Sequence, residues 1–199
     1  IKRIFDLALT TIGVVLLSPI FLLLAILIKL DSRGPVIFAH KRIGKGGKLF
    51  PCLKFRTMCM DADQKLKEYL AANPEARKEW EAEFKLKDDP RVTRVGKVLR
   101  KTSLDEVPQL FNVLIGQMSL VGPRPIVTAE IPKYGPYIKD FYMVHPGITG
   151  MWQVNGRSDT TYEERVQMDS WYVRNWGVWL DIMLLWRTFG VVLQHKGAY

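Results

Sequence analysis

The chain has 199 residues, with 29 Lys or Arg against 20 Asp or Glu, so its formal net charge is +9. This length suits one domain with appendages, and the charge favours a polyanionic partner such as nucleic acid, anionic lipid or a phosphorylated substrate. Cys52 and Cys59 form no CxxC pair and the three histidines lie far apart, which argues against a disulfide framework and a zinc cluster. A reducing compartment is the default.

An uncharged run of 22 residues, from Leu7 to Ile28, lies near the amino terminus. As a helix at ~1.5 Å per residue it would cover the ~30 Å hydrocarbon core of a bilayer. The run is longer than the apolar part of a signal peptide, and no small-residue cleavage site follows it. We therefore expect it to remain attached and to lie in or on a membrane. Because the first residue is Ile1 rather than Met, we also expect the chain to be a piece of a longer protein.

Two features favour a helix that dips into the bilayer and returns. Pro19, preceded by Ser18, lies near the middle of the run, where a proline removes a helix hydrogen bond and costs ~3 kcal/mol or more unless a kink absorbs it. Basic residues flank both ends, whereas positive charge normally marks the cytoplasmic side alone. A re-entrant helix over residues 1–30, with Ser18 satisfying carbonyls freed at the break, explains both features. A kinked true span remains the alternative.

The next segments predict a small hairpin and two surface helices. An alternating apolar pattern predicts a β-hairpin with a basic face, formed by VIFAHKRIG, the turn KGGK and LFPCLKFRTM. The turn does not match GxxxxGK[ST], so ATP chemistry is not supported. Residues 61–88 are charged and helix-prone, with a break at Asn73-Pro74. Residues 85–101 then hold seven basic and two acidic residues directly before an acid pair.

That acid pair is Asp105 and Glu106, in TSLDEVPQLFNVL. An apolar stripe at helical spacing predicts an α-helix here, formed by Val107, Leu110, Phe111 and Leu114. Two helix starts are possible. Ser103 and Glu106 fit a capping box, whereas a start with Asp105 as N-cap would place Pro108 in the first turn, where no backbone N–H is needed. The proline therefore favours Asp105 as the N-cap. Asp105 is then either a structural cap or an ionised nucleophile, because a helix amino terminus stabilises a carboxylate and attracts phosphate.

Two downstream loops present arginines. SLVGPRP holds Arg124 between two prolines, which fix an extended backbone, and Arg binds two phosphate oxygens at once through its planar fork. HPGITGMWQVNGRSD contains an Asn-Gly turn followed by Arg157. Around an acid pair, such cations suit phosphoryl transfer, in which positioning and charge neutralisation do most of the catalytic work.

The carboxyl-terminal part is rich in tryptophan. The segment 179–193, WLDIMLLWRTFGVVL, is too short and too charged to span a membrane comfortably. Its tryptophans and amphipathic spacing are typical of a helix in the headgroup layer. A packed core helix is the alternative that the pattern leaves open.

Several long motifs together resemble the bacterial sugar transferase family, the monotopic phosphoglycosyl transferases: KRIFDL, the Ser18-Pro19 break, KRIG, KFRTM, TSLDEVPQLFNVLIGQMSLVGPRP and PGITGMWQVNGR. The resemblance covers nearly the whole chain and is weakest over residues 61–90. It is closest to the undecaprenyl-phosphate hexose-1-phosphate transferases, which begin the assembly of O-antigen, capsule or exopolysaccharide.

The resemblance implies a magnesium-dependent reaction in two steps. Asp105 would attack the β-phosphate of a UDP-sugar, release UMP and hold a covalent phosphosugar, which polyprenyl phosphate then accepts. Glu106 would bind magnesium together with Asp105 or orient it. Arg124 and Arg157 match arginines that contact phosphates of the nucleotide sugar.

Further positions carry over from the same resemblance. Lys54, Arg56 and Arg100 match basic positions expected to contact phosphate, and Ser18 and Pro19 match the kink of the family's re-entrant helix. His145 departs from the pattern, since Lys or Arg is expected before PGITG. A charged contact from that position is therefore in doubt.

The expected architecture is α+β and mainly helical. It comprises a re-entrant membrane helix at 1–30 and a catalytic domain at 31–199, with a small β-hairpin, catalytic helices and an interfacial carboxyl-terminal helix, on the cytoplasmic face of the bacterial inner membrane. The expected partners are UDP-galactose or UDP-glucose, polyprenyl phosphate and anionic lipids, with Mg²⁺ as cofactor; homo-oligomerisation stays open. The rival hypotheses are a membrane-attached scaffolding module without catalysis and a nucleic-acid-binding protein. No nucleic-acid motif supports the latter.

Overall fold

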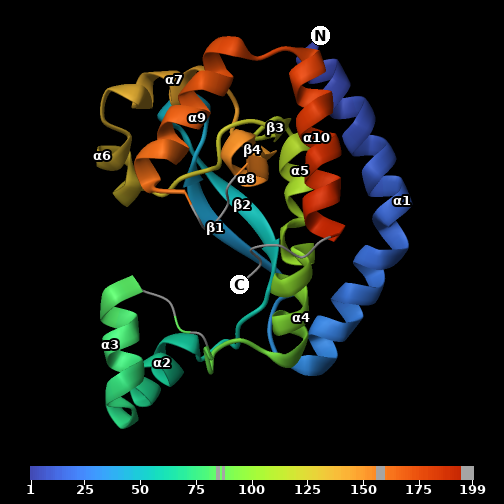
Figure 1. Ribbon diagram of the computed structural model, residues 1–199. Helices are drawn as coiled ribbons and strands as arrows, with labels where there is room; N and C mark the ends of the chain where they lie inside the picture. Colours follow the sequence, from blue (N-terminus) through green and yellow to red (C-terminus); the bar gives the residue numbers. More distant parts are fainter. Residues whose placement is uncertain (84–85, 87, 156–159, 194–199) are drawn as a thin grey trace.

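The computed structural model describes residues 1–83, 86, 88–155 and 160–193 (Figure 1). The helices are α1 (Lys2–Asp31), α2 (Ala62–Ala72), α3 (Pro74–Glu83), α4 (Arg94–Thr102), α5 (Gln109–Leu114), α6 (Ile131–Tyr134), α7 (Ile138–Met143), α8 (Met151–Asn155), α9 (Tyr162–Asn175) and α10 (Val178–Leu193). The strands are β1 (Ile37–Ile43), β2 (Leu49–Phe55), β3 (Ser119–Val121) and β4 (Gly147–Thr149). Short 3₁₀ turns cover Lys45–Gly47, Leu104–Glu106, Thr128–Glu130 and Gly135–Tyr137. The mainly helical character and the small hairpin agree with the sequence prediction.

Strands β1 and β2 form the predicted hairpin. They pair antiparallel, with Ile37 opposite Phe55 at the open end and Ile43 opposite Leu49 at the turn. The turn requires glycine, because Gly46 has a φ of 67° and Gly47 a φ of 76°. Alternate residues along each strand point to opposite faces of the hairpin, so its even-numbered side chains share one face.

Strands β3 and β4 form a short parallel pair that the sequence analysis does not predict. Ser119 lies opposite Gly147, and Val121 lies opposite Thr149. The backbones of Gly122 and Gly147 come very close, since a Cβ atom on Gly147 would lie 2.1 Å from the backbone nitrogen of Gly122. The pairing brings the loop that follows β3 beside the start of α8.

Helix α1 continues through Pro19 and bows along one side of the molecule in Figure 1. Ser18 Oγ donates a hydrogen bond of 2.8 Å to the carbonyl oxygen of Val15. This is the carbonyl that a backbone N–H at position 19 would otherwise bind, so the expected role of Ser18 is confirmed. By length and composition α1 could cross a membrane, and it is the one such helix among the described residues. Its re-entrant course stays a prediction.

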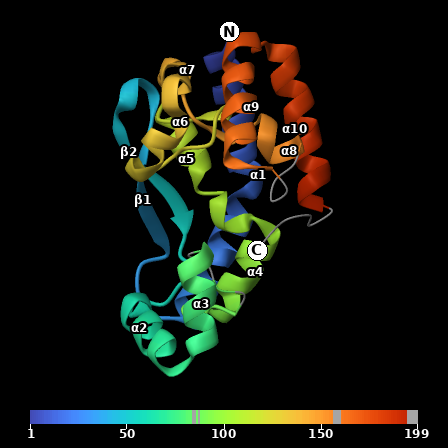
Figure 2. The same cartoon turned by 60° about the vertical axis from the view of Figure 1, so that its left-hand side comes forward.

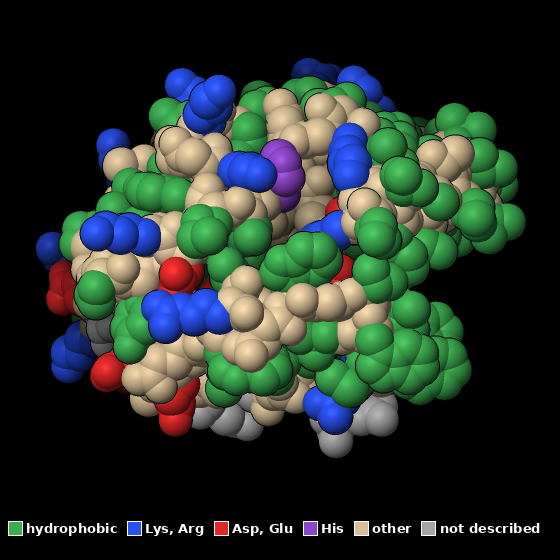
Figure 3. All heavy atoms as spheres, turned by 90° about the horizontal axis from the view of Figure 1, so that it is seen from above, with side chains coloured by type: hydrophobic (Ala, Val, Ile, Leu, Met, Phe, Trp, Pro, Cys, Tyr) green, Lys and Arg blue, Asp and Glu red, His purple; other side chains and the backbone are tan. Residues whose placement is uncertain are grey.

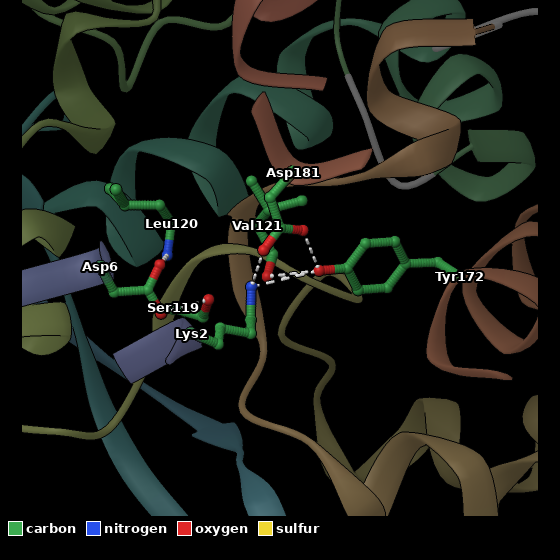
Figure 4. Close-up of polar contacts among 7 residues, drawn as sticks. All are labelled: Lys2, Asp6, Ser119, Leu120, Val121, Tyr172 and Asp181. Atoms are coloured by element: carbon green, nitrogen blue, oxygen red, sulfur yellow. Dashed lines mark hydrogen bonds and ion pairs between the residues drawn. The ribbon is translucent and has the colours of Figure 1, made fainter. Parts of the chain in front are cut away.

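The amino-terminal end of α1 is tied to the body of the protein through polar contacts (Figure 4). Lys2 Nζ lies 2.5 Å from Asp181 Oδ2, and Asp181 Oδ1 accepts a 2.6 Å hydrogen bond from the Tyr172 hydroxyl. One turn further, the buried Asp6 accepts a 2.7 Å hydrogen bond from Ser119 Oγ. These contacts hold α1 against β3, α9 and α10.

The carboxyl-terminal end of α1 packs against the same body. Leu24 and Ile28 are buried in a cluster with Phe55 of β2 and Leu99 of α4. A second cluster lies around β2, β3, α9 and α10, and a third lies around α6 and α7. Both ends of the apolar helix therefore contact one globular unit.

The outward faces of α1 and α10 expose apolar side chains. On α1 these include Ile4, Ile12, Val15, Leu16, Leu22, Leu23, Ile26 and Leu30, and on α10 they are Trp179, Ile182, Trp186 and Phe189. The opposite face of α10 is buried, with Asp181 and Leu184 fully covered. One face of this helix therefore packs in the core and the other is apolar and exposed, whereas its place in the headgroup layer stays a prediction. Figure 3 shows hydrophobic side chains gathered on the right of the molecule, the side on which Figure 1 draws α1 and α10.

Helices α2 and α3 form a charged arm at one end of the molecule, apart from α9 and α10 (Figures 1 and 2). The predicted break is confirmed, since Asn73 ends α2 and Pro74 begins α3. The described side chains of these two helices include no fully buried one. The arm is therefore a solvated appendage, as its composition indicates.

Candidate active site

A cleft of about 1030 Å³ passes the acid pair. It lies between the even-numbered face of the hairpin, the turn after α4, and residues of α8 and α10. Its cationic lining is Arg42, Lys54, Arg56, Arg91, Arg100, Arg124 and Arg165. Asp105 and Glu106 lie on the wall between these cations, so the cleft suits a substrate that carries several negative charges.

The acid pair is positioned by a sharp turn. Helix α4 ends at Thr102, and Ser103 adopts a left-handed conformation with a φ of 57°. The 3₁₀ turn Leu104–Glu106 follows at once. Ser103 is the one described residue other than glycine with a positive φ, and such backbone strain is often found at functional sites.

The expected helix start at Asp105 is not what the structure has. Helix α5 begins at Gln109, and Asp105 lies in the preceding 3₁₀ turn. Pro108 has no N–H with which to reach the carbonyl of Leu104, and the N–H of Val107 takes that carbonyl instead, at 3.3 Å. Asp105 is therefore no N-cap of an α-helix, and the capping explanation for this residue loses its basis.

Lys54 joins the two acids. Its Nζ lies 2.6 Å from Glu106 Oε1 and 3.8 Å from Asp105 Oδ2. The lysine comes from β2 and the acids from the turn after α4, so the contact depends on the packing of the hairpin against that turn. The Asp105 side chain is the less exposed of the two, at 14% against 30% for Glu106.

The two carboxyl groups have pKa values shifted in opposite directions. Burial raises the pKa of Asp105 above its usual value, and the nearby Lys54 offsets this only in part. Burial also raises the pKa of Glu106, but the surrounding cations, chiefly Lys54 and Arg124, outweigh it and leave that pKa lowered. Glu106 is thus the more firmly ionised acid, and Asp105 the more basic carboxylate once it is ionised.

Arg100 lines the same cleft as the acid pair, and its contact with phosphate stays a prediction. It comes from the last turn of α4, lines the cleft, and donates from Nε to Thr57 Oγ1 at 3.0 Å. That bond fixes the side chain and leaves the two terminal amino groups of the guanidinium for a substrate oxygen.

Arg56 has a structural role that the sequence analysis does not anticipate. It is 6% exposed, and its guanidinium donates to the carbonyl oxygens of Ile28, Ser32, Arg33 and Pro35 and to Ser32 Oγ. These five bonds use every N–H of the group. Although Arg56 borders the cleft, it closes the carboxyl-terminal end of α1 and retains no donor for phosphate in this arrangement.

Arg124 stands exposed in the loop after β3, between the buried residues Pro123 and Pro125. Its guanidinium carbon lies 5.7 Å from the ring centre of Trp152, and that of Arg165 lies 4.6 Å from the same ring. Trp152 thus supports two guanidinium groups in the cleft. Arg157, the other arginine expected here, lies outside the described residues.

Four basic residues of the cleft are not predicted as site residues from the sequence: His40, Arg42, Arg91 and Arg165. Arg42 Nη1 donates to the carbonyl oxygen of Pro125 at 3.3 Å, so the hairpin braces the loop of Arg124. A signal for His40 and Arg42 was present, because strand alternation puts them on the same face as Lys54. Arg165 lies on α9, and no sequence signal connects it to the acids.

Asp105 and Glu106 can supply only part of the ligands that a magnesium ion needs. Among the described residues no group of three or more His, Cys, Asp or Glu side chains is placed for a metal. Mg²⁺ is commonly held by one or two carboxylates together with water and substrate phosphates. Asp105 and Glu106 are compatible with that mode, with Lys54 as a competing partner for Glu106.

Comparison with known proteins gives consistent matches. The sequence profile of the family described as bacterial sugar transferase matches residues 1–195. The undecaprenyl-phosphate galactose phosphotransferase of Salmonella typhimurium is 53% identical over 199 residues, which are 100% of this chain and 42% of that protein. The exopolysaccharide production protein ExoY of Rhizobium meliloti is 46% identical over 198 residues, which are 100% of this chain and 88% of ExoY. The UDP-glucose:undecaprenyl-phosphate glucose-1-phosphate transferase of Klebsiella pneumoniae is 40% identical, and the match covers 41% of its length. The chain thus spans about two fifths of the first and third relatives.

Proposed function

Because the chain belongs to the bacterial sugar transferase family, we propose that it transfers a hexose 1-phosphate group from a UDP-sugar to polyprenyl phosphate. The observation that carries this proposal is the acid pair beside Lys54, in a cleft otherwise lined by arginines. The acids offer a nucleophile and the cations offer binding sites for a diphosphate. The relatives are named for galactose and for glucose, so UDP-galactose and UDP-glucose are the donors to try first.

In the first step a carboxylate oxygen of Asp105 forms a bond to the β-phosphorus of the UDP-sugar. The bond from that phosphorus to the bridging oxygen breaks, and UMP leaves with the electron pair. Lys54, Arg100 and Arg124 would neutralise the charge that builds up on the phosphate oxygens. Glu106, which accepts from Lys54, would keep that lysine directed at the site.

In the second step an oxygen of polyprenyl phosphate attacks the same phosphorus, and the bond to Asp105 breaks. The products are polyprenyl diphosphosugar and the free carboxylate. The cleft suits such an acceptor, because its lining includes Leu17 of α1 and Val191 of α10, on the two helices that expose apolar side chains. A lipid whose phosphate reaches the arginines would have its chain on the apolar side of the protein.

In this proposal magnesium binds together with the diphosphate of the donor. When bound, the ion would be held by Asp105, Glu106 or both together with phosphate oxygens, and would screen the charge of the diphosphate. The side chains of Lys54 and Arg100 supply part of the same neutralisation.

We further propose that α1 is re-entrant and that residues 31–199 form the catalytic domain on the cytoplasmic side of the inner membrane. Lys2 at one end of α1 pairs with Asp181, and Ile28 at the other end packs on Leu99. A helix that crossed the bilayer would have to present one of these ends on the far side. Anchoring of both ends to one globular unit supports a helix that enters and leaves on one side.

Intact-mass measurement tests the chemistry. After incubation with UDP-galactose or UDP-glucose and Mg²⁺, without lipid acceptor, the wild-type protein should gain the mass of one phosphohexose and release one equivalent of UMP. The Asp105→Asn variant should gain none, since an amide is no nucleophile here. Asp88→Asn is the matched control, because Asp88 is an exposed acid on the segment before α4. Equal adducts in wild type and Asp105→Asn would show that Asp105 is not the nucleophile, and no adduct in either would favour the scaffolding hypothesis.

Cysteine labelling tests the topology. In a variant without Cys52 and Cys59, single cysteines replace Ile1 and Arg33, which are exposed at the two ends of α1. A membrane-impermeant reagent applied to sealed inverted vesicles should label both positions. Labelling of one position from each side would show that α1 spans the membrane.

A further inference from the structure

The hairpin side of the cleft contains an aromatic pair to which the proposed chemistry gives no role. Phe38 and His40 both line the cleft from β1, and their ring centres are 6.1 Å apart. Phe38 is 51% exposed, although a large apolar ring in a polar cleft would ordinarily be covered. The lining of the cleft also includes Met58, Met60 and Asp63. The hairpin thus presents an exposed apolar ring beside an imidazole to the cleft.

The pair is next to the acid site. Phe38 is directly opposite Lys54 in the hairpin register, and directly opposed side chains on one face lie within contact distance. Lys54 in turn contacts Glu106. A ligand whose phosphates reach Lys54 can therefore place the group attached to them over Phe38.

His40 is suited to an uncharged ligand. Its Nδ1 atom is buried and has no hydrogen-bond partner, so placing a proton there would bury a donor without an acceptor. The neutral ring with its proton on Nε2 avoids that cost. Burial, with Arg42 and Lys54 nearby, lowers the pKa of His40 and favours the same form. A neutral N–H donor fits a carbonyl or hydroxyl group better than it fits a phosphate.

The surroundings of Phe38 argue against a prenyl chain there. Phe38 lies beside His40 and opposite Lys54, and an alkyl chain would have to desolvate such polar groups. The apolar lining residues on the two exposed apolar helices are Leu17 of α1 and Val191 of α10. The hairpin thus offers a flat, partly polar surface to the soluble substrate.

We propose that Phe38 and His40 form the nucleoside subsite, with the uracil ring of the donor stacked on Phe38 and a base carbonyl or ribose hydroxyl accepting from His40. This inference rests on the proposed function, since it gives a binding site to the nucleoside of the same donor, which leaves as UMP in the first step. A stacked base contributes about 1–3 kcal/mol, so loss of the ring should weaken donor binding by roughly 5- to 150-fold.

The test separates the two half-reactions of the full chain in detergent. For Phe38→Ala, the UDP-sugar concentration that gives half-maximal adduct formation should rise roughly ten-fold. Inhibition by UDP should weaken to a similar extent, whereas inhibition by inorganic pyrophosphate should not change. Discharge of a preformed adduct to polyprenyl phosphate should keep its wild-type rate, because no nucleoside is then present. Phe38→Trp should retain wild-type affinity, and Leu49→Ala, which removes an exposed apolar side chain elsewhere on the hairpin, should behave as wild type.

Several results would overturn the subsite. An unchanged donor requirement in Phe38→Ala removes the stacking role, and equal weakening of UDP and pyrophosphate assigns the residue to the phosphates. Slower discharge alone would place the lipid there instead. A wild-type protein that forms no adduct contradicts the proposed function, and that outcome is distinct from all of these.

Discussion

At the scale of single residues, Lys54 controls the ionisation of the acid pair. It is the largest influence that lowers the pKa of Asp105, which burial raises. Replacing Lys54 by Met should therefore raise the pKa of Asp105 further, and the nucleophile should lose its charge at a higher pH. We expect the acid limb of UMP release to move to higher pH, and the plateau rate to fall ~100-fold through loss of a cation at the phosphate. The pH profile of UMP release measures both effects.

Lys41→Met serves as the matched control, because Lys41 is an exposed lysine on the other face of the same hairpin. It should leave the acid limb in place. A Lys54→Met profile that coincides with wild type would show that Lys54 does not tune the nucleophile.

The candidate site could be predicted where local spacing carried the information. Asp105, Glu106 and Arg124 are next to residues that shape the backbone, and these acids and the arginine do line one cleft. Arg56 shows the limit of such reasoning. Its basic character is visible in the sequence, but the carbonyl groups that accept its hydrogen bonds lie at the end of a helix more than twenty residues away.

At the scale of elements, the Lys2 and Asp181 pair fastens α1 to α10. The Asp181 side chain is 1% exposed, so Lys2→Met would leave a buried carboxylate with the Tyr172 hydroxyl as a partner but without its cation. We expect a loss of about 3 kcal/mol in the free energy of unfolding, since removal of one member of a buried pair typically costs ~3–5 kcal/mol. Denaturant unfolding in detergent micelles measures it.

The double variant distinguishes the charge from simple packing. Lys2→Met with Asp181→Asn removes the uncompensated charge and keeps an acceptor for Tyr172, so it should be more stable than Lys2→Met alone. If the two substitutions destabilise additively, the contact is a packing interaction and the electrostatic account is wrong.

The elements themselves were predictable to different degrees. The hairpin and the break at Pro74 follow from strand alternation and from proline chemistry, and both are present. The start of α5 was misplaced because the N-cap and 3₁₀ alternatives use the same residues, and only the hydrogen bond from Val107 to Leu104 decides between them. The parallel pair of β3 and β4 joins segments too short to show a strand pattern.

At the scale of the whole molecule, two apolar helices far apart in the sequence lie on one side of the protein. The length of α1 was evident from its uncharged run, whereas its position beside α10 depends on the buried Lys2 and Asp181 contact. Together their outward faces form a surface that no part of the described chain covers. The cleft has lining residues on both helices, so the acids lie close to the surface that we expect to meet lipid.

This arrangement predicts that membrane contact serves the lipid half of the reaction alone. Trp186 is 78% exposed on α10, so Trp186→Glu should leave the fold intact but put a charge where lipid is expected. Vesicle binding should weaken, and transfer to polyprenyl phosphate in vesicles should slow, while adduct formation from soluble UDP-sugar keeps its rate. Gln167→Glu, which adds the same charge at an exposed position of α9, should change neither. Equal slowing of both half-reactions in Trp186→Glu would mean that the substitution perturbs the cleft itself, and unchanged vesicle binding would remove α10 from the membrane surface.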